Sequence, residues 1–219
     1  MVDIKEFKDV YVPAEDSFLL LRAVKYAYGE VLDMFAGSGI IGLNAAKKSE
    51  RVTFVDINPN AIKAIKYNAK MNGIKNFECI LSDLFSSLDN RKFDVIYANP
   101  PYLPEKKESK WVRHALSGGK EGSELTINLI HSLKAHLKQG GNAFIILSSV
   151  YNTDKVYKEI KRLRLSFEKL SSINFFFEEL ILIKIYDESR NSGKSGQNYS
   201  SSNHKQLSSG TQSKKPKRS

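Results

Sequence analysis

A predicted strand that ends in two consecutive prolines is the feature that most restricts how this chain can fold. Residues 94–98 read Asp-Val-Ile-Tyr-Ala, and Asn99, Pro100, Pro101 and Tyr102 follow. Neither proline can donate a hydrogen bond to a neighbouring strand, and each fixes its own φ and restricts the residue before it. We therefore expect the strand to end at Asn99, with the carboxamide of that residue projecting and an aromatic ring beside it.

The groups at this strand end suit a planar NH2 group. The Asn99 amide oxygen and the adjacent backbone carbonyls can accept its two hydrogen bonds, and the Tyr102 ring offers a flat face for stacking. The alternative is an ordinary exit from a strand into a loop. We predict that four residues form what we call the amide clamp: Asn99, Pro100, Pro101 and Tyr102.

Polar side chains also follow the other strands predicted in this half of the chain. Apolar runs at residues 30–35, 51–55, 77–81 and 92–97 alternate with helical segments at about 40–48 and through Met71. The carboxyl edge of an open parallel sheet is where ligands bind. Capping of a helix is the alternative role for any single aspartate. The side chains expected at this edge are Asp33, Asp56, Asp83 and Asn99.

A glycine turn follows the first of these strands. The segment Ala36-Gly37-Ser38-Gly39 joins the strand to a helix, which begins a strand–helix–strand unit in which the backbone approaches a ligand closely. Asp56 comes about 20 residues later, at the position where such units hold a ribose diol. The turn alone is weak evidence, but the turn together with Asp56 indicates a nucleoside-containing ligand.

The segments on either side of this unit have more than one interpretation. Glu15 and Asp16 start a helix and can complement its dipole, face a ligand, or do both. Residues 103–123 form a polar loop that we expect to face the substrate, with Trp111 either in that role or as an anchor.

The rest of the body is predicted to contain two helices and three strands. The helices are expected at 124–137, capped by Gly140 and Gly141, and at 154–163, and the strands at 142–147, 165–170 and 180–186. Residues 175–177 are expected to pack on the core or an edge.

Composition separates a body from a tail. Residues 1–187 contain the predicted elements and form one domain, whereas residues 188–219 are rich in Ser and Gly and are expected to be disordered. Seven Lys or Arg residues lie from Asp187 onward, against two acidic ones, so half of the formal net charge of +10 belongs to this end of the chain. The basic residues at the end of this tail are compatible with contact to nucleic acid, with a targeting signal or with a solvated tail of no specific role.

Other residue types exclude some classes of protein. A single cysteine, Cys79, excludes a disulfide framework, and its apolar surroundings predict a buried thiol. The four histidines show no metal-ligand spacing with each other or with the cysteine, so no metal site is predicted. No apolar run reaches the roughly 20 residues of a membrane span, and residues 1–10 lack a signal-peptide core. We expect a soluble protein of the cytoplasm or nucleus, without membrane contact.

Together these features resemble the class I S-adenosylmethionine-dependent methyltransferases. The implied fold is α/β and Rossmann-like, a seven-stranded, mostly parallel sheet with an antiparallel C-terminal strand and helices on both faces. The Asn-Pro-Pro-Tyr run is similar to that of the amino-group methyltransferases. Two more segments, Val10-Tyr11-x-Pro13-x-Glu15-Asp16-Ser17 and Ala115-Leu116-Ser117-Gly118-Gly119-x-x-Gly122, resemble the HemK/PrmC-type protein-glutamine methyltransferases, which modify the Gln of the Gly-Gly-Gln motif in class-1 translation release factors.

The resemblance implies S-adenosyl-L-methionine as cofactor and a role for each matching residue. The catalytic residues would be Asn99, Pro100 and Tyr102, and the whole amide clamp would bind the substrate glutamine. Asp33 would take the ammonium group of the cofactor, Asp56 its ribose hydroxyls, and Asp83 with Leu84 its adenine edge. The complete implied set for the cofactor is Ser17, Asp33, Gly37, Gly39, Asp56, Asp83, Leu84 and Asn99.

The chain departs from the bacterial members of this family in two respects. Only about nine residues precede the first motif, which resembles the short archaeal and eukaryotic branch, whose members form a heterodimer with a small zinc-binding activator protein. Phe35 replaces a glycine of the usual turn, as in many RNA methyltransferases. The alternative function is therefore methylation of an exocyclic amine, adenine N6 or guanine N2, in RNA or DNA. Lysine methylation is a lesser variant, and a non-catalytic binding module is disfavoured because the strand-end residues are all present.

Overall fold

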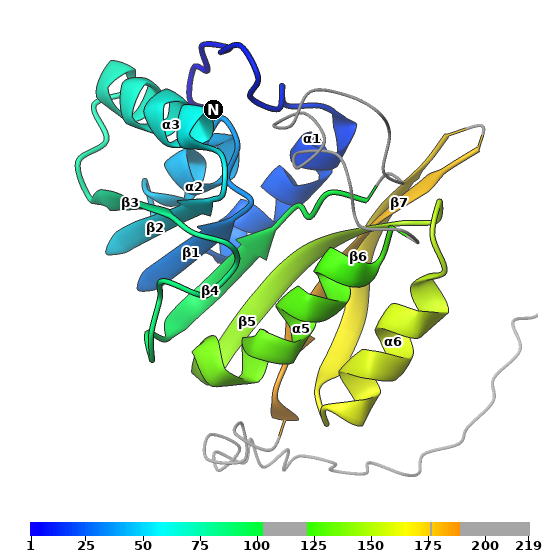
Figure 1. Ribbon diagram of the computed structural model, residues 1–219. Coiled ribbons are helices and arrows are strands. Elements are labelled where there is room, and N and C mark those ends of the chain that lie inside the picture. The colour runs from blue at the N-terminus through cyan, green and yellow to red at the C-terminus, as the bar shows by residue number, and fades with distance from the viewer. Residues whose placement is uncertain (103–121, 176, 189–219) are drawn as a thin grey trace, which may run out of the picture.

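One seven-stranded sheet with helices on both faces makes up the body of the protein (Figure 1). The computed structural model describes residues 1–102, 122–175 and 177–188. The strand order is β3-β2-β1-β4-β5-β7-β6. The strands are β1 (Glu30–Met34), β2 (Arg51–Asp56), β3 (Phe77–Leu81), β4 (Phe93–Ala98), β5 (Leu137–Ser148), β6 (Ser166–Asn174) and β7 (Glu179–Tyr186).

The first five strands pair in parallel, and β7 runs antiparallel to both of its neighbours, β5 and β6. The predicted fold class is therefore confirmed. One face carries α1 (Glu15–Leu21), the 3-10 helix η1 (Arg22–Tyr26), α2 (Ile40–Ala45) and α3 (Pro59–Met71). The opposite face carries α5 (Glu124–His136) and α6 (Thr153–Arg162).

Each face of the sheet has its own apolar core. Side chains alternate along a strand, so Val31 of β1 packs with α1, α2 and α3 while its neighbour Leu32 packs with α5 and α6. A central parallel strand is covered on both sides and reads as a continuous apolar run. In β4 this run includes Tyr97, which is fully buried and donates its hydroxyl to the carbonyl oxygen of Ala23 at 3.1 Å. Thus β4 is fixed to the η1 side two residues before the amide clamp.

The predicted glycine cap at the end of α5 is wrong. The chain becomes extended at Leu137, so β5 starts directly after the helix and the glycines lie inside the strand. Phe93 pairs with Leu137 but Val95 pairs with Asn142, which marks an irregularity in the ladder. Gly140 takes a φ of +76° there, which suits glycine. The two glycines therefore accommodate a bulge in β5 beside β4.

Two predictions about apolar side chains also need correction. Phe175 and Phe177 lie at the turn between β6 and β7 and are 44% and 97% exposed, so the core alternative is wrong, and their place beside the edge strand β6 leaves only the edge alternative. Cys79 is half-buried, because β3 is an edge strand with a neighbour on one side only. Burial still raises the pKa of its thiol to about 11.

The segment before α1, residues 1–13, is held to the body by asparagine side chains, and we call it the strap. Asn72 accepts from the Asp3 N–H at 2.9 Å and donates to the Asp3 carbonyl at 2.7 Å. Asn68 makes the same pair of bonds with Lys5, at 3.0 and 3.3 Å. Asn44 accepts from the Val2 N–H, and Asn58 donates to the Asp9 carbonyl. These side-chain amides pair with backbone N–H and C=O groups of the strap, as a neighbouring strand would, and they hold the strap against α2 and α3.

Some sequence predictions lie outside the described residues: the disordered tail from residue 189 onward, Phe176, and the loop with Trp111, Gly118 and Gly119. Within residues 1–102, 122–175 and 177–188, none of the helices has both the length and the apolar character to span a bilayer.

Candidate active site

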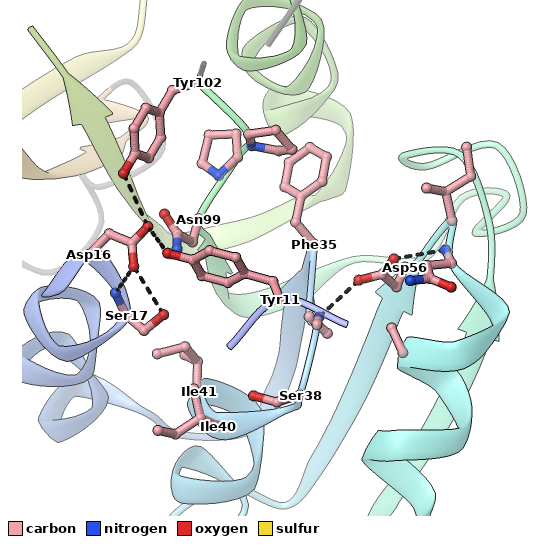
Figure 2. A pocket seen from close by; sticks show the side chains of 17 residues that line it. Tyr11, Asp16, Ser17, Phe35, Ser38, Ile40, Ile41, Asp56, Asn99 and Tyr102 are labelled. Carbon is pink, nitrogen blue, oxygen red and sulfur yellow. Dashed lines mark hydrogen bonds between the residues drawn. The ribbon is translucent and has the colours of Figure 1, made fainter. Parts of the chain in front are cut away.

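A cavity lies at the carboxyl edge of the sheet, where the ends of β1, β2 and β4 meet the strap and the start of α1 (Figure 2). Its volume is about 180 Å³. The lining consists of Tyr11 from the strap, Asp16 and Ser17 from α1, Phe35, Ala36, Gly37, Ser38, Ile40 and Ile41 from the first turn and α2, Asp56, Ile57, Asn58 and Ala61 after β2, and the amide clamp. The predicted convergence of several strand ends on one site is thus observed.

The glycine turn after β1 depends on left-handed backbone conformations. The φ values of Phe35, Gly37 and Gly39 are +60°, +52° and +84°. The asparagine-held strap closes over this turn, and a Cβ added to Gly37 would lie 3.8 Å from the Cβ of Tyr11. Gly39 does not line the cavity, because it serves instead as the N-cap residue of α2.

Asp33 lies beneath the glycine turn, outside the cavity, and supports the turn through a hydrogen bond to α2. Its side chain is 2% exposed, is absent from the cavity lining, and accepts the N–H of Gly42 at 2.8 Å. This position corrects the expectation that Asp33 faces the ligand directly. Burial raises the pKa of Asp33 to about 8, although the Gly42 N–H acts in the opposite direction. Asp33 therefore connects β1 to α2 beneath the cavity.

Asp56 faces the cavity and also fixes its wall. One carboxylate oxygen accepts the N–H of Gly37 at 2.8 Å, and the other accepts the N–H of Asn58 at 2.8 Å. Burial raises the pKa of Asp56, and the backbone N–H groups around it partly oppose that effect. A carboxylate offers about four lone-pair positions. Asp56 can therefore hold the glycine turn and still accept two hydrogen bonds from a ligand.

Asp83 and Leu84 lie outside this cavity. They follow β3, which is the neighbour of β2 on the far side from β1. Asp83 is exposed, and Leu84 is partly buried against the second core with a φ of +47°. The carbonyl of Leu84 accepts the Ser82 hydroxyl at 3.1 Å, which stabilises the turn. The structure thus places these two residues one strand beyond the Asp56 side of the cavity.

The amide clamp contains an unsatisfied hydrogen-bond acceptor. Pro100 and Pro101 are buried, and Asn99 lies on the cavity wall at the end of β4. The side-chain oxygen of Asn99 is buried and has no hydrogen-bond partner among the described residues. Leaving a buried acceptor unpaired costs about 1–3 kcal/mol. A ligand that brings an N–H group to Asn99 would recover that free energy.

Tyr11 and Asp16 were absent from the predicted set of functional residues. Asp16 is 3% exposed, and one of its oxygens accepts the hydroxyls of Tyr11 at 2.7 Å and Tyr102 at 3.4 Å (Figure 2). The N-cap of α1 is Ala14, which makes no side-chain capping bond. Asp16 lies in the first turn of α1, where it can complement the helix dipole, and it also lines the cavity, so both interpretations offered for it hold. The motif around it was visible in the sequence, but its contact with Tyr102, 86 residues away, was not.

Gly122 is the part of the predicted Gly-Gly-x-x-Gly segment that the structure describes. Its φ is +83°, and an added Cβ would lie 2.7 Å from the carbonyl oxygen of Tyr102 and 3.4 Å from the Tyr151 side chain. Only glycine fits this position without a shift. The motif residue therefore lets the chain pass close to the backbone of the amide clamp.

The strand order, the glycine turn after β1, the aspartate after β2 and the cavity at the carboxyl edge define a Rossmann-like methyltransferase of class I. The methyltransferase small domain family matches residues 14–174, and this chain belongs to that family. The chain is thus a methyltransferase, as predicted. S-adenosylmethionine is the cofactor of this class.

Two relatives narrow the comparison. A Methanocaldococcus jannaschii protein, provisionally named a protein N5-glutamine methyltransferase, is 38% identical over 190 residues, which cover 84% of this chain and 95% of the relative. A release factor glutamine methyltransferase of Koribacter versatilis is 34% identical over 149 residues, covering 60% of this chain and 52% of that protein. The predicted resemblance to HemK-type enzymes is confirmed.

A solved structure shares the fold. It is the E. cuniculi Mtq2-Trm112 complex, which is responsible for methylation of the translation termination factor eRF1. The TM-score is 0.65 at 20% sequence identity, with 82% of this chain and 99% of that chain covered.

Proposed function

We propose that this protein uses S-adenosyl-L-methionine to methylate N5 of the glutamine in the Gly-Gly-Gln motif of a class-1 translation release factor. The observation that carries the proposal is the buried Asn99 oxygen, which has no hydrogen-bond partner among the described residues and belongs to the same cavity lining as Tyr102. An amide NH2 group supplies the donors that this oxygen lacks. The names of the relatives favour glutamine over a nucleobase as the source of that group.

The residues present fit the cofactor. The glycine turn brings backbone close to the cavity, Ser17 lies at the start of α1, and Asp56 has lone pairs left for two ribose hydroxyls. Sites for small organic ligands usually measure at least about 300 Å³. Since this cavity is smaller, the adenine would extend past Asp56 toward Asp83 and Leu84. Asp33 would act indirectly, by holding the turn.

The protein contributes positioning and electrostatics. When bound, the cofactor supplies an activated methyl group, so the difficulty lies in the amide nitrogen, whose lone pair is delocalised. Asn99 and the Pro100 carbonyl would accept the two N–H bonds and orient the nitrogen, while Tyr102 stacks on the amide plane. Positive charge builds on the nitrogen during transfer. The same two oxygens then interact more strongly with the transition state than with the ground state.

We also propose that the protein works with a small zinc-binding partner, as the short-branch resemblance implies. The edge strand β3 supports this proposal: Leu81 is 55% exposed there, and Phe77 and Cys79 are only partly buried. An edge strand with apolar side chains is prone to association unless a partner covers it. The chain produced alone should therefore be poorly soluble. Contact of the basic C-terminal residues with nucleic acid stays a prediction.

Mass spectrometry of a release factor tests the main proposal. The protein, with and without the partner, is incubated with isotope-labelled cofactor and either a release factor or total RNA. We expect one methyl group on the Gln of the Gly-Gly-Gln peptide, and no transfer to a release factor in which that Gln is replaced by Ala. Label found in RNA alone would overturn the proposal in favour of an exocyclic amine.

A further inference from the structure

A single carboxylate oxygen joins three segments that are far apart in the sequence. Oδ2 of Asp16, on α1, accepts the hydroxyl of Tyr11 from the strap and that of Tyr102 from the amide clamp. The two tyrosines thus belong to different parts of the site. Tyr11 lies over the glycine turn, and Tyr102 belongs to the amide clamp after β4 (Figure 2).

We propose that Asp16 is a positioning residue that couples the cofactor side of the cavity to the amide clamp by holding Tyr11 and Tyr102 on one oxygen. The inference rests on the proposed function in one respect, namely that Tyr102 forms a wall for the acceptor amide. The coupling itself is a property of three side chains in one cavity.

Asp16 is itself held in a fixed orientation. Its other oxygen, Oδ1, accepts the Ser17 backbone N–H at 2.5 Å and the Ser17 hydroxyl at 3.2 Å. The Oδ2 atom is thereby directed at the two tyrosines. Burial first, and the Asp16 charge next, raise the pKa values of Tyr11 and Tyr102, so both hydroxyls remain protonated and donate. Hydrogen bonds to a charged group are stronger than those between neutral groups.

The two hydroxyls are not held equally. The bond from Tyr11 measures 2.7 Å and that from Tyr102 measures 3.4 Å, which is close to the limit for a hydrogen bond. The backbone of Gly122 passes close to the Tyr102 carbonyl, where an added Cβ would lie 2.7 Å from the oxygen, so the backbone there has little room to shift. The adjustable part of the clamp is therefore the Tyr102 side chain, and hydrogen bonds of this kind often shorten only when ligands bind.

This arrangement makes the two binding steps dependent on each other. A cofactor that packs beneath Tyr11 restrains Asp16, and Asp16 then restrains the ring of Tyr102 before the acceptor arrives. Coupling between two sites is reciprocal, so Tyr102 must also influence cofactor affinity. That reciprocal effect can be measured without any acceptor.

The test is a double-mutant cycle read by calorimetric titration with S-adenosylhomocysteine. The variants are Tyr11→Phe, Tyr102→Phe and the double variant, which keep both rings and remove only hydroxyls. We expect the loss of affinity in the double variant to differ from the product of the single losses by about threefold or more, since residues in one hydrogen-bond network are non-additive. Tyr97→Phe, which removes a buried hydroxyl outside the cavity, is the control and should leave affinity unchanged.

The same cycle in an Asp16→Ala background identifies the carrier of the coupling. Alanine removes the oxygen that accepts both tyrosine hydroxyls, whereas an asparagine amide could still donate to the two hydroxyl oxygens and keep the network. We expect the non-additivity to disappear. Independent losses in the native background, or non-additivity that persists with Ala at position 16, would overturn the proposal. Failure of the native protein to methylate glutamine would instead refute the proposed function, since this cycle uses no acceptor.

Discussion

The two halves of the cavity differ in how their polar atoms are satisfied. On the cofactor side, Asp56 accepts backbone N–H groups from Gly37 and Asn58, and Asp33 accepts from Gly42. On the clamp side, the Asn99 oxygen is buried without a partner among the described residues. The first half is therefore complete before a ligand binds, and the second becomes complete only when one does.

Because of this difference, we expect one half of the cavity to determine affinity for the cofactor and the other half to determine turnover. A wall fixed by internal hydrogen bonds needs no ordering when the cofactor binds, which favours affinity. An unpaired acceptor raises the free energy of the free enzyme, and it gains most from a ligand whose N–H groups become more acidic as the reaction proceeds. We expect substitutions in the two halves to affect different measured quantities.

Asn99→Ala should have the largest effect. It removes the unpaired oxygen, and losing one such group usually lowers turnover by about 10²–10³-fold. Affinity for S-adenosylhomocysteine should change far less, because Asn99 makes no bond to the glycine turn or Asp56 in the described residues. Single-turnover methylation and calorimetry measure the two quantities. Asn142→Ala in β5 is the control, and near-normal turnover by Asn99→Ala would remove the basis of the clamp mechanism.

Asp56→Asn should show the opposite pattern. Both carboxylate oxygens accept backbone N–H groups, so an amide nitrogen in either place would face another donor. Loss of charge-assisted hydrogen bonds of about 1.5–3 kcal/mol predicts cofactor affinity about 10–100-fold weaker. Turnover at saturating cofactor should be largely retained. Asp154→Asn, at the start of α6, serves as the control. Equal losses of affinity and turnover would contradict the division of the cavity into two halves.

Gly122→Ala tests the support of the clamp, with Gly73→Ala as its matched control. Both glycines have positive φ, +83° and +67°, so each alanine should incur backbone strain of about 1–2 kcal/mol. Only at position 122 does the added carbon meet another atom, the Tyr102 carbonyl oxygen at 2.7 Å. We expect Gly122→Ala to lose more unfolding free energy than the control by about 1 kcal/mol, and to raise KM for the acceptor. Identical behaviour of the two variants in denaturant titration and steady-state kinetics would count against the support role.

The raised pKa of Asp33 leads us to expect a smaller effect, a dependence of the unfolding free energy on pH. Its pKa of about 8 lies above its ordinary value of 3.8, so between about pH 4 and pH 8 the folded protein binds the proton more tightly than the unfolded chain. The unfolding free energy therefore falls as pH rises through this window. From pH 5 to pH 8, the native protein should lose at least about 1 kcal/mol more than Asp33→Asn in urea titrations. Parallel pH profiles would show that Asp33 is ionised in the fold.

The sequence predicted the elements and the strand-end chemistry because both follow from local patterns. Apolar runs located every strand, and the Pro-Pro pair placed Asn99 at a strand end. Contacts between distant segments were not predictable, since no local pattern links Asp16 to Tyr102 or aims Asp33 at Gly42 and away from the cavity. The glycines of β5 were misassigned for a similar reason: a bulge is defined by the partner strand, which a single segment does not reveal.

The strap also has a consequence for how the chain folds during synthesis. Residues 2–5 leave the ribosome before their partners Asn44, Asn68 and Asn72, which follow 42–69 residues later. At about 5–20 residues per second, several seconds pass before α3 can receive the strap. The cofactor site can therefore close only after the first half of the sheet has emerged, and during that interval Val2 and Val10, buried in the finished protein, remain available to chaperones.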